Sequence, residues 1–398
     1  MNSYKRSLDL SELVKIKSFF LFGPRQVGKT TLLGECFPDS LSINLLKTGM
    51  FRSLSANPGK IRELIAGAPK TGDQQIVVID EIQKLPILLD EVQDLMESDR
   101  SLRFVMTGSS ARKLKRSGAN LLGGRARWLA LHPISYLEYL TAGAQALDTI
   151  ETLVQWGGLP SVLNSSTKKE DLNDYIGTYL KEEIQAEALV RNIGAFSRFL
   201  QTAALLNAKQ IMFSNVASDA EVPARTVREY FDVLEDTLIG KLLAPFGHTV
   251  KRKAVVASKF YFFDVGLANA MVGRWSIQQG TPEYGDAFEH WIWRELDTAI
   301  AYRRLDVDLS YWRSTSKFEV DFVVTPKHKT VPELAIEVKA KKNVGHKDLS
   351  GLLAFAEDFS KVRKIVVSLE SMKRITTDGV EIWPVLEFIR GLWNGEIL

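Results

Sequence analysis

One loop, residues 23–30, constrains this chain more than any other feature of its sequence. It reads Gly-Pro-Arg-Gln-Val-Gly-Lys-Thr, a complete G-x-x-x-x-G-K-[ST] pattern. The apolar stretch Lys17–Phe22 predicts a buried strand before the loop, and Thr31–Phe37 can continue as a helix after it. Glycines let backbone N–H groups curl around phosphates, and the helix N-terminus adds the positive end of its dipole. A chance glycine-rich turn would lack these flanking elements, so the pattern predicts a phosphate-binding loop in an α/β fold.

Two side chains of the loop have expected roles in binding a nucleotide. Lys29 can reach the β- and γ-phosphates, and the Thr30 hydroxyl can ligate Mg²⁺. ATP and Mg²⁺ are therefore the expected ligands. The residues expected to bind them are Gly23, Pro24, Arg25, Gln26, Val27, Gly28, Lys29, Thr30, Thr31 and, further along the chain, Asp80.

An acidic pair supports this interpretation. The apolar run Gln75–Ile79 predicts a buried strand, and Asp80 and Glu81 follow it, at the end of a parallel strand where ligands bind. We expect Asp80 to hold Mg²⁺ through water, and Glu81 to orient or deprotonate the attacking water. Alone, such a pair more often begins a helix. The loop about fifty residues upstream favours the catalytic role.

A third predicted strand, Leu102–Met106, ends in the polar segment 107–110. Ser109, or next Thr107, could sense the γ-phosphate, although a cap on a following helix explains these residues equally well. The segment 111–127 then carries six basic residues and no acidic one. Arg125, after two glycines, is predicted to act as an arginine finger. The other basic residues could equally contact a DNA backbone or a neighbouring subunit.

These motifs, with Gly124-Arg125 and the segment 131–138, resemble AAA+-type ATPases of bacteria and archaea that are fused to a C-terminal domain of unknown function. The resemblance continues through Gly157–Pro160, the segment 226–234 and Phe262–Leu267, so it covers nearly the whole chain. It implies ATP binding, a helical lid with a winged-helix-like module, and a C-terminal part similar to PD-(D/E)XK nucleases.

The middle of the chain is acidic and helical. The net formal charges of residues 1–140, 141–250 and 251–398 are +6, −5 and +2. Helices are predicted over Lys168–Arg191 and Thr226–Leu238, the second at the recognition position of a winged helix. Its outward residues carry a net charge of −2, which phosphates would repel, so we do not expect it to read a major groove. Lys251–Lys253 is the local basic exception.

A second constellation lies near the C-terminus. The segments 308–313 and 318–325 predict a hairpin, and in 333–339 strict alternation places Glu337 and Lys339 on one face. Glu289, one residue off an apolar helical stripe, and Asp321 complete the helix-Glu, strand-Asp and Glu-x-Lys pattern of PD-(D/E)XK nucleases. In such a site Asp321 and Glu337 hold Mg²⁺, and Lys339 stabilises the developing oxyanion. Alone, a Glu-x-Lys pair on a strand is usually an exposed charge pair.

Together these features predict three domains: an AAA+-type ATPase core (1–140), a helical, winged-helix-like lid (141–250) and an α+β restriction-endonuclease-like domain (251–398). We expect an ATPase whose nucleotide state controls a Mg²⁺-dependent nuclease-like domain acting on nucleic acid, DNA rather than RNA. The alternative is an ATPase switch or scaffold whose nuclease-like domain only binds DNA or protein. A homo-oligomer is compatible with either function.

The cellular setting is predicted from what the sequence lacks. Cys36 is the single cysteine, which excludes an internal disulfide and fits a reducing compartment. No apolar run approaches the roughly 18–20 residues needed to span a bilayer, and residues 1–13 lack the apolar core of a signal peptide. We therefore expect a soluble cytoplasmic protein with no membrane partner.

Overall fold

The computed structural model describes residues 4–69, 73–109, 122–143, 146–180, 192–249, 251, 254 and 256–398. They form two compact units. We call residues 5–134 with 236–239 the small unit, and residue 4 with 135–235 and 240–398 the large unit. Of the expected ATPase core, residues 5–134 belong to the small unit, while Tyr4 and residues 135–140 belong to the large unit. The expected second and third domains, 141–250 and 251–398, belong to one compact unit apart from residues 236–239.

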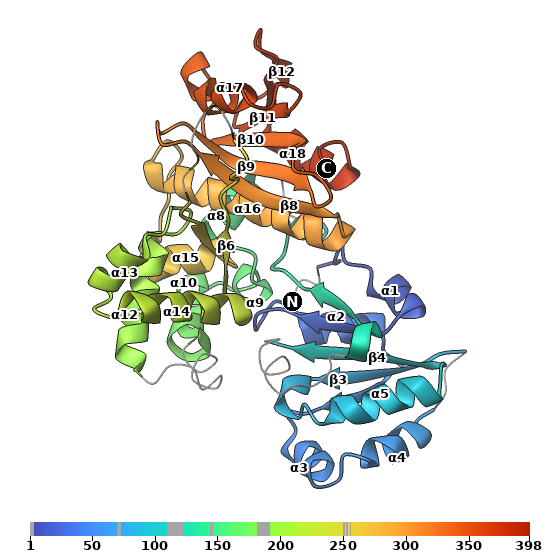
Figure 1. Ribbon diagram of the computed structural model, residues 1–398. Helices are drawn as coiled ribbons and strands as arrows, with labels where there is room; N and C mark the ends of the chain where they lie inside the picture. The colour runs from blue at the N-terminus through green and yellow to red at the C-terminus, as the bar shows by residue number, and fades with distance from the viewer. Residues whose placement is uncertain are drawn as a thin grey trace. The chain divides into compact units, whose positions relative to one another are not determined.

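The small unit is built on a five-stranded parallel sheet with the order β2-β3-β4-β1-β5. Helices are interspersed with the strands along the chain, and Figure 1 shows α5 lying across β3 and β4. The strands are β1 (Phe19–Phe22), β2 (Leu41–Asn44), β3 (Gln75–Asp80), β4 (Leu102–Gly108) and β5 (Arg127–Ala130). The helices are α1 (Leu10–Ile16), α2 (Lys29–Cys36), α3 (Thr48–Ala56), α4 (Lys60–Ala66) and α5 (Leu88–Ser98).

The order of the strands determines where a ligand can bind. After β1 the chain crosses to β2 at the sheet edge and returns through β3 to β4, and β5 then pairs with the other side of β1. The direction of winding therefore reverses at β1. In open parallel sheets, ligands bind beyond the carboxyl ends of the strands at such a reversal. The phosphate-binding loop begins directly after β1, at this position.

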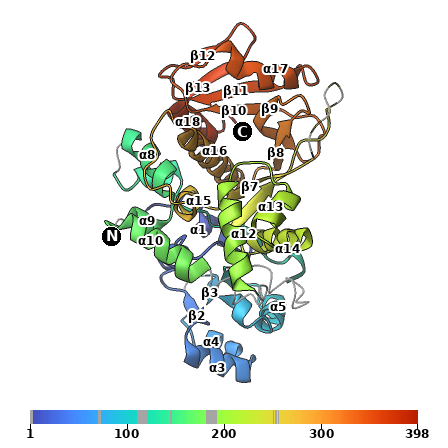
Figure 2. The same cartoon turned by 90° about the vertical axis from the view of Figure 1, so that its left-hand side faces the viewer.

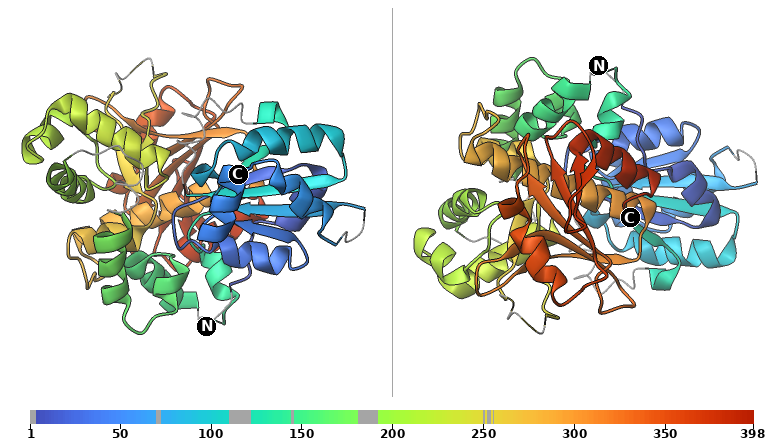
Figure 3. Two further views of the ribbon diagram at one scale, coloured as in Figure 1. Left: turned by 90° about the horizontal axis from the view of Figure 1, so that it is seen from below. Right: turned by 90° about the horizontal axis from the view of Figure 1, so that it is seen from above.

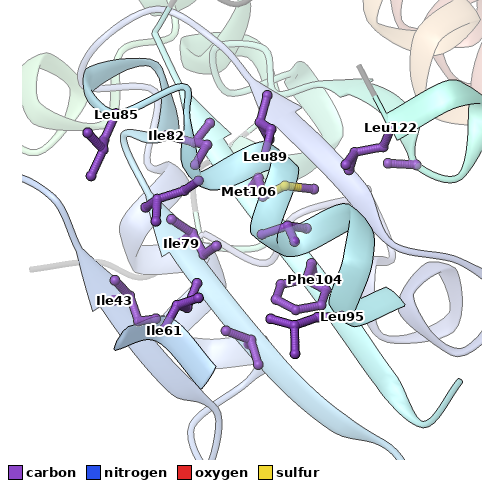
Figure 4. Close-up of a cluster of buried hydrophobic side chains, with 14 of the residues drawn as sticks. Ile43, Ile61, Ile79, Ile82, Leu85, Leu89, Leu95, Phe104, Met106 and Leu122 are labelled. Atoms are coloured by element: carbon purple, nitrogen blue, oxygen red, sulfur yellow. The ribbon is translucent and has the colours of Figure 1, made fainter. Parts of the chain in front are cut away.

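The core of the small unit explains why the three predicted strands form. Figure 4 shows a cluster of buried apolar side chains between the sheet and its helices, including Ile79, Leu89, Phe104 and Met106. β3 and β4 are buried almost throughout, as their unbroken apolar runs predict for strands covered on both faces. Each such side chain contributes roughly 1.5–3 kcal/mol relative to exposure.

Helices form the first half of the large unit. They are α7 (Tyr136–Leu140), α8 (Ala146–Trp156), α9 (Pro160–Leu163), α10 (Lys168–Asp174), α12 (Ile193–Leu205), α13 (Phe213–Asp219), α14 (Ala224–Asp236) and α15 (Val265–Met271). The helix expected over 168–191 begins as α10 and continues as a π-helix over Tyr175–Leu180. Residues 181–191 lie outside the described part of the chain.

Three of these helices and two strands follow one another in the order expected of a winged-helix-like module. α12, α13 and α14 pack through Phe199, Phe213 and Phe231, and Figure 2 shows them grouped together. The antiparallel pair β6 (Gly240–Leu243) and β7 (Lys259–Phe262) follows. On α14 the exposed Arg225 is paired with Glu229, so its charge is compensated within the helix. The winged-helix interpretation itself stays a prediction.

The second half of the large unit is a mixed six-stranded sheet of order β12-β13-β11-β10-β9-β8 (Figure 3, orange to red). The predicted hairpin is confirmed, since β8 and β9 pair antiparallel. The central strand β10 pairs antiparallel with β9 and parallel with β11, and α16 and α17 both contact it. The bounds are α16 (Pro282–Arg303), β8 (Val307–Arg313), β9 (Glu319–Pro326), β10 (Leu334–Lys339), α17 (Ser350–Ala356), β11 (Arg363–Ser368), β12 (Arg374–Ile375), β13 (Glu381–Pro384) and α18 (Val385–Asn394).

Two motifs of the sequence resemblance meet inside the large unit. The Asp264 carboxylate accepts hydrogen bonds from the backbone N–H groups of Gly158, at 2.7 Å, and Leu267, at 3.0 Å. A Cβ at Gly157 would lie 2.0 Å from an Asp264 oxygen, so only glycine fits there. These residues therefore join α8 to α15 and serve the fold. Among the described residues, no helix combines the length and apolar character needed to cross a membrane.

Candidate functional site

The phosphate-binding loop joins β1 to α2, as the sequence predicts. Gly28 precedes the first helical residue, Lys29, with φ +94°, a left-handed conformation that favours glycine. At the start of the loop, a Cβ on Gly23 would lie 2.5 Å from the carbonyl oxygen of Leu131, so the backbone must pass close to the end of β5. Both glycines of the motif are thus required by this geometry.

Lys29 is buried and folded over its own loop. Its side-chain amine donates hydrogen bonds to the carbonyl oxygens of Gly23, at 2.6 Å, and Pro24, at 2.9 Å. The loop is also held from outside, because Arg6 donates to the carbonyl oxygens of Val27, at 2.8 Å, and His132. The amine is therefore positioned at the loop before any phosphate binds. The sequence did not indicate this role of Arg6, because the residue lies before the first predicted strand and outside the motifs.

Asp80 is the centre of a buried polar network at the carboxyl edge of the sheet. Its Oδ2 accepts a hydrogen bond from the amide of Asn44 at 3.1 Å and lies 3.5 Å from the Thr30 hydroxyl, while its Oδ1 accepts from the Thr107 hydroxyl. These residues come from the ends of β2, α2, β3 and β4. Sequence reasoning missed Asn44, although a polar residue at a strand end in such a sheet is a usable signal.

Glu81 lies beside this network in a strained conformation. Its φ of +62° and ψ of +45° are left-handed, which is uncommon for a residue other than glycine, and such residues cluster at functional sites. Its backbone N–H donates to the Thr107 hydroxyl at 3.2 Å. Thr107 therefore links Asp80 to Glu81 directly, whereas Ser109, the residue first expected to sense the γ-phosphate, contacts Gln83.

Gln83 connects Glu81 to Ser109. Its amide donates to the Glu81 carboxylate at 2.6 Å and to the Ser109 hydroxyl at 3.3 Å. A Cβ on Gly108 would lie 2.5 Å from the side-chain oxygen Oε1 of Gln83, so the glycine leaves the room that the Gln83 amide group needs. That oxygen is buried, and none of the described residues donates a hydrogen bond to it. Gln83 lies two residues after Glu81 in the chain, but its role became visible only in the structure.

Arg125 lies at the opposite edge of the sheet from this network. Two residues after it, Arg127 begins β5 and pairs with Phe19, the first residue of β1, whereas the loop follows the last residue of that strand. A four-residue strand spans roughly 13 Å. The Arg125 side chain instead forms an ion pair with Glu97, at 2.9 Å. Arg125 therefore does not belong to its own chain's phosphate site, and a finger role is left only toward a neighbouring copy.

Several residues named in the sequence predictions lie outside the described part of the chain. They are Ser110, the basic residues of 111–121, and Arg252 with Lys253.

The four residues of the predicted nuclease pattern converge in the large unit, in what we call the acidic centre: Glu289, Glu319, Asp321, Glu337, Lys339 and Lys259. Lys259, the first residue of β7, is the member that sequence reasoning missed. Its amine lies 2.7 Å from Glu319, 2.9 Å from Glu289 and 3.5 Å from Asp321. Glu289 also accepts a hydrogen bond from the Tyr261 hydroxyl at 2.7 Å.

Burial and like charge control protonation in the acidic centre. Desolvation, opposed by Lys259, raises the pKa of Glu289 to about 7. Desolvation and the charge of Asp321 raise the pKa of Glu337 well above its usual range. Lys339 contacts Glu337 Oε1, while Glu337 Oε2 is buried and accepts no hydrogen bond from the part of the chain that the structure describes. Asp321 Oδ2 accepts from the backbone N–H of Val338 at 2.8 Å.

This arrangement does not fit the metal-binding role expected of Asp321 and Glu337. Each of these carboxylates already faces an ammonium group, from Lys259 and Lys339 respectively. Within the described part of the chain, no three His, Cys, Asp or Glu side chains are grouped so that they could hold a metal ion. The buried Lys259 amine explains why the carboxylates do not need a metal ion, because it already supplies the positive charge that they require.

Three family models match successive parts of the chain. Residues 15–140 match the family described as AAA domain. Residues 147–277 and 284–388 match two domains of unknown function, DUF8612 and DUF4143. The first match supports an ATPase domain of the AAA type in the small unit. The other two imply no activity.

Curated relatives resemble most of the chain at low identity. An uncharacterized protein of Mycobacterium tuberculosis is 26% identical over 317 residues, which are 76% of this chain and 66% of that protein. An uncharacterized protein of Haemophilus influenzae is 22% identical over 77% of this chain and 78% of its own length. The chain thus spans about two thirds of the mycobacterial relative.

Solved structures offer only a weak likeness. The ORC2 protein of Aeropyrum pernix, in its ADPNP–ADP complexes, gives a TM-score of 0.30 at 14% identity, covering 69% of this chain and 96% of that one. The ORC1 protein of the same organism, in complex with DNA, gives 0.27 at 12% identity, covering 66% and 90%. At these scores the likeness carries no argument about fold or function.

Proposed function

We propose that the small unit binds ATP with Mg²⁺ and hydrolyses it. The observation that carries this proposal is the Asp80 network, which joins the carboxyl ends of three strands to the first turn of the helix after the phosphate-binding loop. Such a set of oxygen ligands beside a loop of backbone N–H groups suits a nucleotide triphosphate with its cation.

Different groups of the loop bind the phosphates and the Mg²⁺ ion. The backbone N–H groups of residues 25–31 surround the phosphates, and Lys29 exchanges its bonds to two loop carbonyls for bonds to phosphate oxygens. Thr30 and Asp80, whose oxygens already lie 3.5 Å apart, would hold Mg²⁺, with Asp80 acting through water. The ion, when bound, neutralises phosphate charge during transfer.

Glu81 and its neighbours prepare the attacking water. The Glu81 carboxylate orients the water or accepts its proton, and the hydrogen bond from Gln83 holds that carboxylate in place. Because Gln83 also contacts Ser109, and Thr107 contacts both Asp80 and Glu81, either hydroxyl can report the presence of the γ-phosphate to the acidic pair.

Arg125 completes the site only between copies of the chain. It lies at the amino edge of its own sheet, in a surface pocket of about 560 Å³ that is also lined by Lys17 and Arg100. A neighbouring copy that presents this edge would supply the positive charge that stabilises the transition state. The proposal therefore includes a homo-oligomer as the active form.

Hydrolysis of ATP by the purified chain tests this function. We expect turnover with Mg²⁺ and ATP, and loss of both binding and turnover in Lys29→Ala. Lys15→Ala is the matched control, because Lys15 is an exposed lysine paired with Glu12 outside the site. Equal turnover in the wild type and Lys29→Ala would refute the proposal.

For the large unit, the acidic centre favours the second of the two functions considered above. A Mg²⁺-dependent nuclease needs carboxylates that are available to the metal, whereas Lys259 and Lys339 neutralise them here. We propose that the nucleotide state of the small unit controls a large unit that binds its partner, DNA or protein, without cleaving it. A cytoplasmic location belongs to the same proposal.

Incubation of the chain with plasmid DNA and Mg²⁺ or Mn²⁺, with and without ATP, distinguishes the two functions. We expect no metal-dependent cleavage. Cleavage that disappears in both Glu337→Ala and Lys339→Ala would establish the nuclease instead, while cleavage that survives both substitutions would indicate contamination.

A further inference from the structure

Lys259 holds a position in the acidic centre that calls for an explanation beyond ATP hydrolysis. Its amine lies within 3.5 Å of carboxylates from two elements, Glu289 on α16 and both Glu319 and Asp321 on β9. The Lys259 side chain is only 3% exposed, so water does not solvate its charge and the amine itself must neutralise the carboxylates. The Tyr311 ring lies below the amine, at 5.4 Å from the ring centroid.

The backbone keeps this amine in place. Lys259 begins β7, where it pairs with Leu243 of β6, and on its other side it forms a bridge with Gln210. The neighbouring N–H of Phe260 donates to the carbonyl oxygen of Lys209. Backbone pairing on both sides fixes the start of the Lys259 side chain, and the three ion pairs hold its amine in the centre.

The charges of the centre depend on this amine. Four carboxylates, Glu289, Glu319, Asp321 and Glu337, face three cations. Two of these cations, Arg313 and Lys339, each pair with a single carboxylate, Glu319 and Glu337 respectively. Lys259 alone bridges three. Interaction with these acidic groups keeps the pKa of Lys259 well above its usual range despite burial, so the amine stays charged.

We infer that Lys259 takes the place of a divalent metal in the acidic centre, so that the centre binds no metal in the native protein and gains one when this amine is removed. The inference is independent of ATP binding, because every residue it uses belongs to the large unit. A divalent ion in this position would need oxygen ligands at about 2.0–2.6 Å. The carboxylates that now lie 2.7–3.5 Å from the amine would therefore have to move inward to reach it.

Binding of Mn²⁺, followed by electron paramagnetic resonance of the free ion, tests the inference. Lys259→Met removes the charge and keeps the chain length, and we expect it to bind about one Mn²⁺ more per chain than the wild type. Adding Asp321→Asn to Lys259→Met should abolish the extra site, which separates it from any Mn²⁺ bound near Thr30. Lys259→Arg, which keeps the charge, should bind no more than the wild type.

Thermal unfolding of the same proteins supplies a second readout, because removal of the amine exposes three carboxylates to one another. We expect Lys259→Met to melt lower than the wild type in EDTA and to recover on addition of Mn²⁺, while Mn²⁺ leaves Lys259→Arg unchanged. If Lys259→Met folds only with Mn²⁺, the inference is supported.

Two results would overturn the inference. The first is Mn²⁺ bound by the wild type and lost in Asp321→Asn alone, since the native centre would then hold a metal beside Lys259. The second is a Lys259→Met protein that neither binds extra Mn²⁺ nor recovers stability with it.

Discussion

Thr107 offers the sharpest test of the network around Asp80, because one hydroxyl performs two tasks there. It donates to the Asp80 carboxylate and accepts from the backbone N–H of Glu81, at 3.2 Å. The side chain is fully buried. Thr107→Val has nearly the same shape, so the substitution removes both hydrogen bonds without leaving a cavity.

The expected loss in the free energy of unfolding follows from these two hydrogen bonds. A hydrogen bond to a charged group contributes about 1.5–3 kcal/mol, and a buried N–H left without a partner costs about 1–3 kcal/mol. We therefore expect Thr107→Val to lower the free energy of unfolding of the small unit by about 3 kcal/mol. Thr107→Ser keeps the hydroxyl and loses only a buried methyl group, so it should cost about 1 kcal/mol.

Hydrogen exchange of the β3 and β4 amides, followed by mass spectrometry in low denaturant, measures this quantity for the small unit separately from the large one. ATP turnover should fall in Thr107→Val, because Asp80 and Glu81 lose their shared partner, and should be retained in Thr107→Ser. If Val is tolerated as well as Ser in both assays, the network does not organise the site and this reasoning fails.

Three further outcomes are expected. Glu81→Gln should bind ATP but hydrolyse it at least about tenfold more slowly, since the base is lost; turnover unchanged in a single-turnover assay would contradict the role. Arg125→Ala and Lys29→Ala chains, each inactive alone, should regain ATP turnover when mixed if the finger acts between copies, and mixtures as inactive as their parts would argue against it. Burial raises the pKa of Glu295 to about 7, so its folded form holds a proton that the unfolded chain releases near pH 4.5. The contribution of Glu295 to stability is then greatest below pH 4.5 and is lost as the pH rises to 7, a change of about 3 kcal/mol. Glu295→Gln should flatten this decline in pH-dependent denaturant unfolding, and an equally steep decline in the variant would refute the assignment.

Local patterns predicted the parts of the small unit well. The loop of residues 23–30 depends on glycine conformations and on flanking apolar strands, both of which act over a few residues. The partners that organise Asp80, namely Asn44 and Thr107, come from the ends of other strands. Their position next to Asp80 depends on strand order, which crosses the sheet and leaves no local signature.

The location of Arg125 is a second feature that the sequence could not reveal. Two glycines and a basic run made it a plausible finger, yet its strand register places it at the amino edge, paired with Glu97. Register between parallel strands is decided by packing of the whole sheet, so no spacing along the chain could reveal on which edge Arg125 lies.

The sequence by itself determined the phosphate-binding loop, the acidic pair after β3 and the alternation that puts Glu337 beside Lys339, because helix and strand periodicity and glycine conformation are local properties. Only the tertiary structure decided what these carboxylates face. Lys259 begins a strand far from them in the chain, and long-range pairing of that strand carries its amine into the acidic centre. A buried charge must be matched by whatever the fold brings next to it, and that neighbour is chosen by the packing of the complete unit.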